Sequence, residues 1–100
     1  MKKAEEIFSH RGLTESNNYL MDIIVYKVPK SKKFPDGIKS KFRLIHAPSN
    51  SLVILIDNHE PFGFHEHTKN EERKKLVISK WEDALDLFMS KVKELEDEQQ

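Results

Sequence analysis

Cysteine is absent from the 100 residues of this chain, so disulfides, zinc sites built on thiolates and cysteine nucleophiles are excluded. Glycine is scarce, with 3 residues, and the chain contains no glycine-rich phosphate loop, Gly-x-Ser-x-Gly elbow or His-Glu-x-x-His helix. No apolar run approaches the roughly 18 residues of a membrane span, and the charged N-terminus lacks the apolar core of a signal peptide. We therefore expect a cytoplasmic protein with no membrane partner.

An excess of charge of one sign is also missing. The 17 basic residues balance 17 acidic ones, and the formal net charge is zero. Proteins that depend on non-specific attraction to nucleic acid are normally strongly basic, so only a local basic patch is compatible with such a ligand here. The length allows one domain, residues 1–100, with a small core.

The hydrophobic pattern predicts several β-strands after a polar segment at residues 1–18, in which at most a short helix at 4–8 is expected. One predicted strand is rich in β-branched and aromatic residues, a second alternates apolar and polar residues, and a third is continuously apolar. The third is predicted to lie at the centre of the sheet, buried on both faces. A further antiparallel strand is predicted to follow the central turn. In the order described, these four strands are predicted at residues 19–28, 38–46, 51–56 and 62–67.

The C-terminal part predicts an amphipathic helix. Ser79 and Glu82 have the spacing of a capping box, which makes Ser79 the predicted N-cap. Apolar residues then recur at steps of three and four, so one stripe of the helix should lie on the sheet. The charge run at 68–75 is predicted to be solvated and the acidic tail at 94–100 to fray. The predicted fold class is α+β, with a mainly antiparallel sheet of three to four strands covered by this helix.

A histidine cluster stands out in the segment Asp57-Asn58-His59-Glu60-Pro61-Phe62-Gly63-Phe64-His65-Glu66-His67, which holds three of the five histidines. Imidazole titrates near neutral pH, so clustered histidines can exchange protons, hold a metal or bind phosphate. His65 and His67 are two residues apart, so they share one face of an extended segment. His59 lies in the turn before them. Asp57, at a strand end, either orients an imidazole or ends the strand through an Asx turn. These four residues are the candidate catalytic residues.

A basic ladder accompanies the cluster. Lys39, Lys41 and Arg43 share the polar face of the alternating strand. Cleavage of RNA without a metal or other cofactor needs a base for the 2′-hydroxyl, an acid for the leaving oxygen and a cation for the phosphate, and two histidines with one Lys or Arg are sufficient. The ladder residues are therefore the candidate phosphate-binding residues. Whether they lie beside the histidines depends on the strand order.

Other interpretations of these residues stay open. His59, His65 and His67 can act as metal ligands, with Asp57 or a water completing the sphere, although their spacing matches no specific zinc signature. The histidines can also be simply solvated, and the ladder can protect a strand edge from aggregation. A non-catalytic interaction or metal-binding module and a structural domain of a larger assembly are therefore alternatives to an enzyme, and a homodimer is left open.

The order of these features resembles the TumE-like small toxin proteins, which are encoded beside helix-turn-helix antitoxins. A hydrophobic strand ends in Asp57-Asn58, a turn with His59 and Pro61 follows, and a His-x-His pair precedes a helix that opens with Ser79. The resemblance covers roughly residues 42–88. It implies a toxin of a toxin-antitoxin pair that acts on RNA, as a ribonuclease dependent on histidine, and is neutralised by an antitoxin protein.

Overall fold

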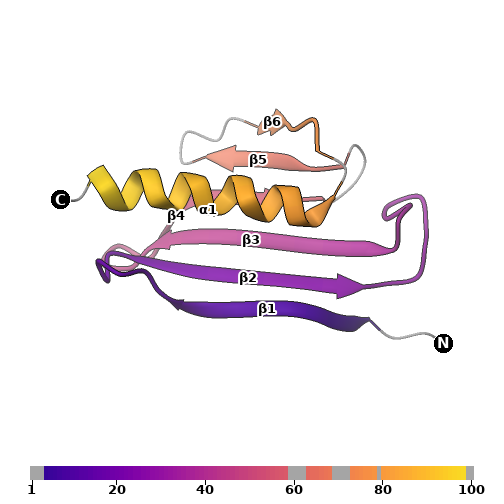
Figure 1. The fold of residues 1–100 in the computed structure, drawn as a ribbon, viewed down its shortest axis with the longest axis horizontal. Coiled ribbons are helices and arrows are strands. Elements are labelled where there is room, and N and C mark those ends of the chain that lie inside the picture. The colour runs from indigo at the N-terminus through magenta and orange to yellow at the C-terminus, as the bar shows by residue number, and fades with distance from the viewer. Residues whose placement is uncertain (1–3, 59–62, 69–72, 79, 99–100) are drawn as a thin grey trace.

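The computed structural model describes residues 4–58, 63–68, 73–78 and 80–98. Within these ranges, six strands form one antiparallel sheet in chain order and one helix lies against one of its faces (Figure 1). The predicted α+β class, with an antiparallel sheet and a C-terminal helix, is confirmed, but the strand number of three to four was too low. The elements are β1 (Glu5–Leu13), β2 (Tyr19–Lys27), β3 (Ile38–His46), β4 (Ser51–Asp57), β5 (His65–Thr68), β6 (Arg73–Lys75) and α1 (Trp81–Glu98).

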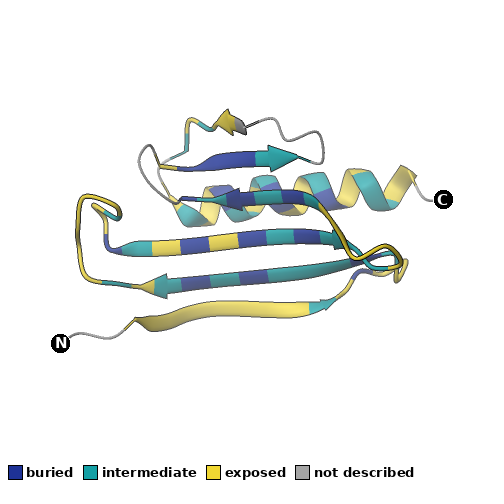
Figure 2. Cartoon of the chain, turned by 180° about the vertical axis from the view of Figure 1, so that it is seen from behind, coloured by how far each residue is buried: buried dark blue, intermediate teal, exposed yellow. Residues whose placement is uncertain are grey.

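The strands β2, β3 and β4 lie where the hydrophobic pattern predicts them. In β3 the apolar Phe42 and Leu44 are fully buried, whereas Lys41, just before Phe42, is exposed and Arg43 between the two is partly exposed. The prediction that β4 is buried on both faces is wrong, because Ile56 is fully buried whereas Leu52 is 40% exposed. The physical reason is that α1 covers only one face, so each central strand has one core face and one outer face (Figure 2).

Both edges of the sheet differ from the prediction. The N-terminal segment forms β1, not a short helix at 4–8, because it pairs along its length with β2, and such pairing between strands overrides local preference. At the other edge, three residues of the charge run that was predicted to be only solvated form β6 beside β5. The two strands that sequence reasoning missed are thus the two edge strands.

Helix α1 supplies the other half of the core. Ala84, Phe88 and Val92 are buried, and the rings of Phe88 and Phe42 lie 5.9 Å apart between their centroids. Trp81, Leu85 and Leu95 also pack against the core, as the predicted stripe requires. Ser79, the predicted N-cap, lies outside the described residues. No helix in the described part of the chain is both long enough and apolar enough to cross a membrane.

The C-terminal end of α1 is attached to the first hairpin. The helix continues to Glu98, so the prediction that the chain frays from residue 94 is wrong for residues 94–98. The Glu96 carboxylate accepts a hydrogen bond from the backbone N–H of Ser16 at 2.8 Å and a second from the Ser16 hydroxyl. These hydrogen bonds join the last turns of the helix to the β1–β2 connection, which explains why this acidic end is ordered.

Candidate functional site on the open face of the sheet

The face of the sheet opposite α1 is called the open face here. Residues that are directly opposite on antiparallel strands share a face, so the strand register defines rows of neighbours across the sheet. Three rows contain the predicted site residues. The first row is Ser9, Ile24, Lys41, Asp57, His65 and Lys75; the second is Arg11, Asp22, Arg43, Leu55 and His67; the third is Glu6, Tyr26 and Lys39.

The rows show that the histidines and the basic ladder share the open face. In the first row Asp57 separates Lys41 from His65, and in the second row Leu55 separates Arg43 from His67. Neighbouring strands lie about 4.8 Å apart, so each cation is anchored about 10 Å from its imidazole across one intervening strand. The long Lys41 side chain can shorten that separation. A phosphate bound over Leu55 in the second row is therefore within reach of both kinds of side chain, and this position lies one row away from the Asp57 carboxylate, which would repel it.

The two histidines of the pair differ in accessibility. His65 is buried, with 3% of its surface exposed, whereas His67 and Asp57 are partly exposed. Lys41 is exposed. A ligand on the open face therefore meets His67 and Lys41 directly, while His65 lies within the packed part of the sheet.

Sequence reasoning missed an ion-pair group in the second row. The Asp22 carboxylate binds the Arg43 guanidinium, and Arg11 Nη1 lies 3.5 Å from the same Asp22 oxygen. Two guanidinium groups thus share one carboxylate, which leaves a net positive charge on this group of three residues. The Arg43 guanidinium is, however, already partly occupied by its ion pair with Asp22. The signal in the sequence was the single acidic residue in the apolar segment 19–28, and its partners could be identified only once the strand register was known.

Glu66, between the two histidines, faces the opposite way. It pairs in register with Ile56 on the core face, is itself buried, and its carboxylate lies 3.0 Å from Lys91 Nζ on α1.

Asn58 is also structural. Its side-chain amide accepts a hydrogen bond from the Ser40 backbone N–H at 2.9 Å and donates one to the Ile38 carbonyl at 2.6 Å. The amide continues the β3–β4 pairing beyond Asp57 and so fixes the strand end on which Asp57 lies.

The metal-binding alternative depends on a residue outside the described part. Among the described residues, no group of three or more His, Cys, Asp or Glu side chains is placed to hold a metal ion. His59 lies outside the described residues, so the predicted ligand set of His59, His65 and His67 stays a prediction, as does a catalytic role for His59.

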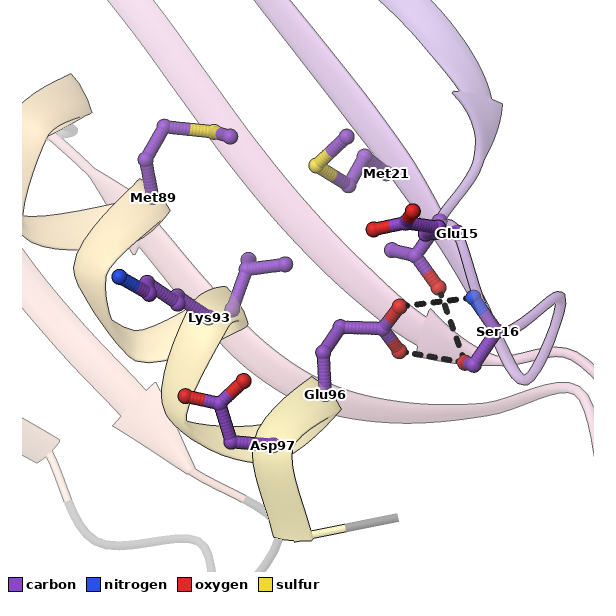
Figure 3. Close-up of a pocket in the computed structure, with 9 residues that line it drawn as sticks. Glu15, Ser16, Met21, Met89, Lys93, Glu96 and Asp97 are labelled. Carbon is purple, nitrogen blue, oxygen red and sulfur yellow. Dashed lines mark hydrogen bonds between the residues drawn. The ribbon is translucent and has the colours of Figure 1, made fainter. Parts of the chain in front are cut away.

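A cleft lies on the other side of the molecule, between α1 and the β1–β2 connection, with a volume of about 620 Å³ (Figure 3). Met21 and Met89 contribute to its apolar wall, and the Ser16–Glu96 hydrogen bonds lie at one end. The hydrogen bond from the Ser16 hydroxyl is the largest cause of a lowered pKa of the Glu96 carboxyl. None of the predicted site residues lines this cleft, so it is distinct from the open face.

Comparison with known proteins gives no match to a protein-family model and no significant match to a curated protein or a solved structure. The resemblance to TumE-like toxins therefore stays a prediction that rests on residues 42–88. The chemistry of the open face is the remaining basis for a function.

Proposed function

We propose that the open face binds RNA and cleaves it by proton transfer, without a metal or an organic cofactor. The observation that carries the proposal is the strand order, which brings His65 and His67 onto the same face as Lys39, Lys41 and Arg43. A different order would have separated the cations from the imidazoles. Tyr26 lies in the row of Lys39, and an aromatic ring on a basic sheet face is a suitable platform for an unpaired base.

The reaction follows from these groups. A base removes the proton of a 2′-hydroxyl, the 2′-oxygen attacks the adjacent phosphorus, and the bond from phosphorus to the 5′-oxygen breaks as an acid protonates that oxygen. The products are a 2′,3′-cyclic phosphate and a 5′-hydroxyl. We assign one proton transfer to the accessible His67 and the other to His65. Lys41 stabilises the charge that develops on the phosphate.

The toxin part of the proposal has a separate basis. The order of Asp57, the His-x-His pair and the C-terminal helix resembles that of the TumE-like proteins, and in such a pair a helix-turn-helix antitoxin would bind this chain and neutralise it. Expression without a partner should then arrest growth and degrade cellular RNA. A specific observation favours the alternative of a non-catalytic interaction module, because His65 is 3% exposed and Arg43 is already paired with Asp22.

The experiment that tests the proposal is cleavage of a short single-stranded RNA by the purified protein in the presence of a chelator, with the products separated by chromatography. Cleavage should give a 2′,3′-cyclic phosphate and should be absent with a 2′-deoxy substrate. His67→Ala and Lys41→Ala should lower the rate. Matched controls are His10→Ala and Lys74→Ala, which change an exposed histidine and an exposed lysine at positions on the other face. RNA that is bound but never cut by the wild type would favour the interaction module.

A further inference from the structure

Strand β1 is an outer edge of the sheet that offers its backbone to another strand. Within the described chain it pairs with β2 alone, and nearly all of its side chains are exposed. Three of them are large and apolar, with Ile7 45%, Phe8 39% and Leu13 54% exposed. A long edge with unpaired backbone groups and apolar side chains is a template for strand addition.

The two edges of the sheet are protected unequally. The opposite edge strand, β6, has three residues and contains Lys74 and Lys75, and a short, lysine-rich edge discourages pairing. Strand β1 has nine residues, and its register irregularity lies between Glu6 and Phe8. From Phe8 to Leu13 the pairing with β2 is regular, so this stretch is able to extend the sheet.

We propose that this edge binds a second copy of the chain, with the two β1 strands antiparallel about a two-fold axis at His10. This axis is perpendicular to the sheet and passes between the two copies of His10, which lie opposite each other. Residues before His10 in one copy then pair with residues after His10 in the other copy. The regular stretch from Phe8 to Gly12 is symmetric about His10. In this register Phe8, whose ring stacks on Trp81 of its own chain, lies opposite Gly12 of the second copy, which has no side chain to clash with it.

Charge and closure favour a second copy as the occupant. In this register Arg11 lies opposite Ser9 of the second copy and His10 lies opposite His10, so no two Lys or Arg side chains and no two Asp or Glu side chains face each other between Ile7 and Leu13. Ile7 lies in the register irregularity just before Phe8, so it comes near Leu13 of the second copy, and the two exposed apolar residues approach each other at each end. Because β1 pairs with β1, the assembly closes as a dimer, whereas β6 is too short to extend it into a filament.

The dimer would join two six-stranded sheets into one continuous sheet. A two-fold axis perpendicular to the sheet leaves both open faces on the same side. The two basic ladders would then lie on the same side of the dimer, about 24 Å apart, with β2 and β1 of both copies between them. This inference does not depend on RNA cleavage, because it rests on β1 alone.

The register can be tested by cross-linking, since the chain has no cysteine of its own. In the dimer the two His10 Cα atoms lie about 4.5 to 5.5 Å apart, within the range of a disulfide. His10→Cys should therefore form a disulfide-linked dimer under mild oxidation. Ser9→Cys should not, because the two copies of residue 9 are offset by two positions and lie about 8 Å apart. A mixture of Ser9→Cys and Arg11→Cys should cross-link, whereas neither variant should do so alone.

The interface itself is tested by molar mass in solution. The wild type should sediment as a dimer in the micromolar range, and the double variant Ile7→Lys, Leu13→Lys should be a folded monomer by circular dichroism, because lysines then face each other at both ends. Leu52→Lys is the matched control, since it charges a similarly exposed apolar residue away from β1 and should leave the dimer intact. A monomeric wild type, or a dimer that His10→Cys does not cross-link, would overturn the proposal.

Discussion

Lys91 on α1 and Glu66 on β5 form an ion pair across the interface between the helix and the sheet, with 3.0 Å between Nζ and the carboxylate oxygen. The Glu66 side chain is only 6% exposed, and that of Lys91 is 31% exposed. The same alternation that turns Glu66 toward the helix turns His65 and His67 toward the open face. The ion pair therefore holds the short strand that carries the candidate site.

Removing the Lys91 side chain should destabilise the fold. Lys91→Ala leaves the buried Glu66 carboxylate without its ion-pair partner, and an uncompensated buried charge should cost about 1 to 3 kcal/mol in the free energy of unfolding. Urea denaturation measures this change. The matched control is Lys93→Ala on the same helix, an exposed lysine whose removal should change stability by less than about 0.5 kcal/mol. Equal midpoints for the two variants would show that the ion pair contributes little.

The sequence pattern predicts β3 well and β1 poorly, and the reason is physical. A strand with one core face and one open face shows a period of two, which β3 displays through Phe42 and Leu44. Strand β1 has few apolar residues and forms because its backbone pairs with β2. This pairing depends on the neighbouring strand, so it leaves no periodic pattern in the sequence of β1. The shared face of His65 and His67 likewise follows from periodicity, whereas the pairing of Asp22 with Arg43 becomes visible only in the strand register.

The Asn58 amide should control the local stability of the β3 end. Asn58→Asp keeps the shape of the side chain but replaces the Nδ2 donor, which faces the Ile38 carbonyl, with an acceptor. Loss of this partly buried hydrogen bond, with two acceptors left facing each other, should cost about 1 to 3 kcal/mol. In hydrogen exchange, the Ser40 amide should lose more protection than the Leu44 amide in the middle of the same strand. Uniform loss along β3 would instead indicate a global effect with no local role for Asn58.

The Ser16–Glu96 attachment should make stability depend on pH at acid values. The Ser16 hydrogen bonds lower the pKa of Glu96 in the folded state, so the carboxylate stabilises the fold above its unfolded pKa, and this contribution is lost as the pH falls through the lowered folded pKa. Glu96→Gln should therefore be less stable than the wild type at neutral pH, with the difference shrinking as the solution is acidified. Thermal denaturation over a pH series measures this. The matched control for the loss of one carboxylate is Glu94→Gln, an exposed residue on the same helix, and an equal loss of stability in both variants would show that the Ser16 attachment is not the cause.

The roles of His65 and His67 should be separable by the pH dependence of RNA cleavage. Two coupled imidazoles that act as acid and base give a bell-shaped rate profile whose limbs belong to the pair. His67→Ala should remove one limb and lower the rate by about 100-fold to 10,000-fold, without unfolding the protein, because His67 is partly exposed. His65→Ala changes a buried residue, so its circular dichroism spectrum and denaturation midpoint must be measured beside its rate. Lys41→Ala should lower the rate and keep the bell shape, since lysine binds the phosphate and transfers no proton. If His67→Ala retains both limbs and the full rate, then neither proton transfer passes through His67, and the open face is better explained as a surface for binding a partner.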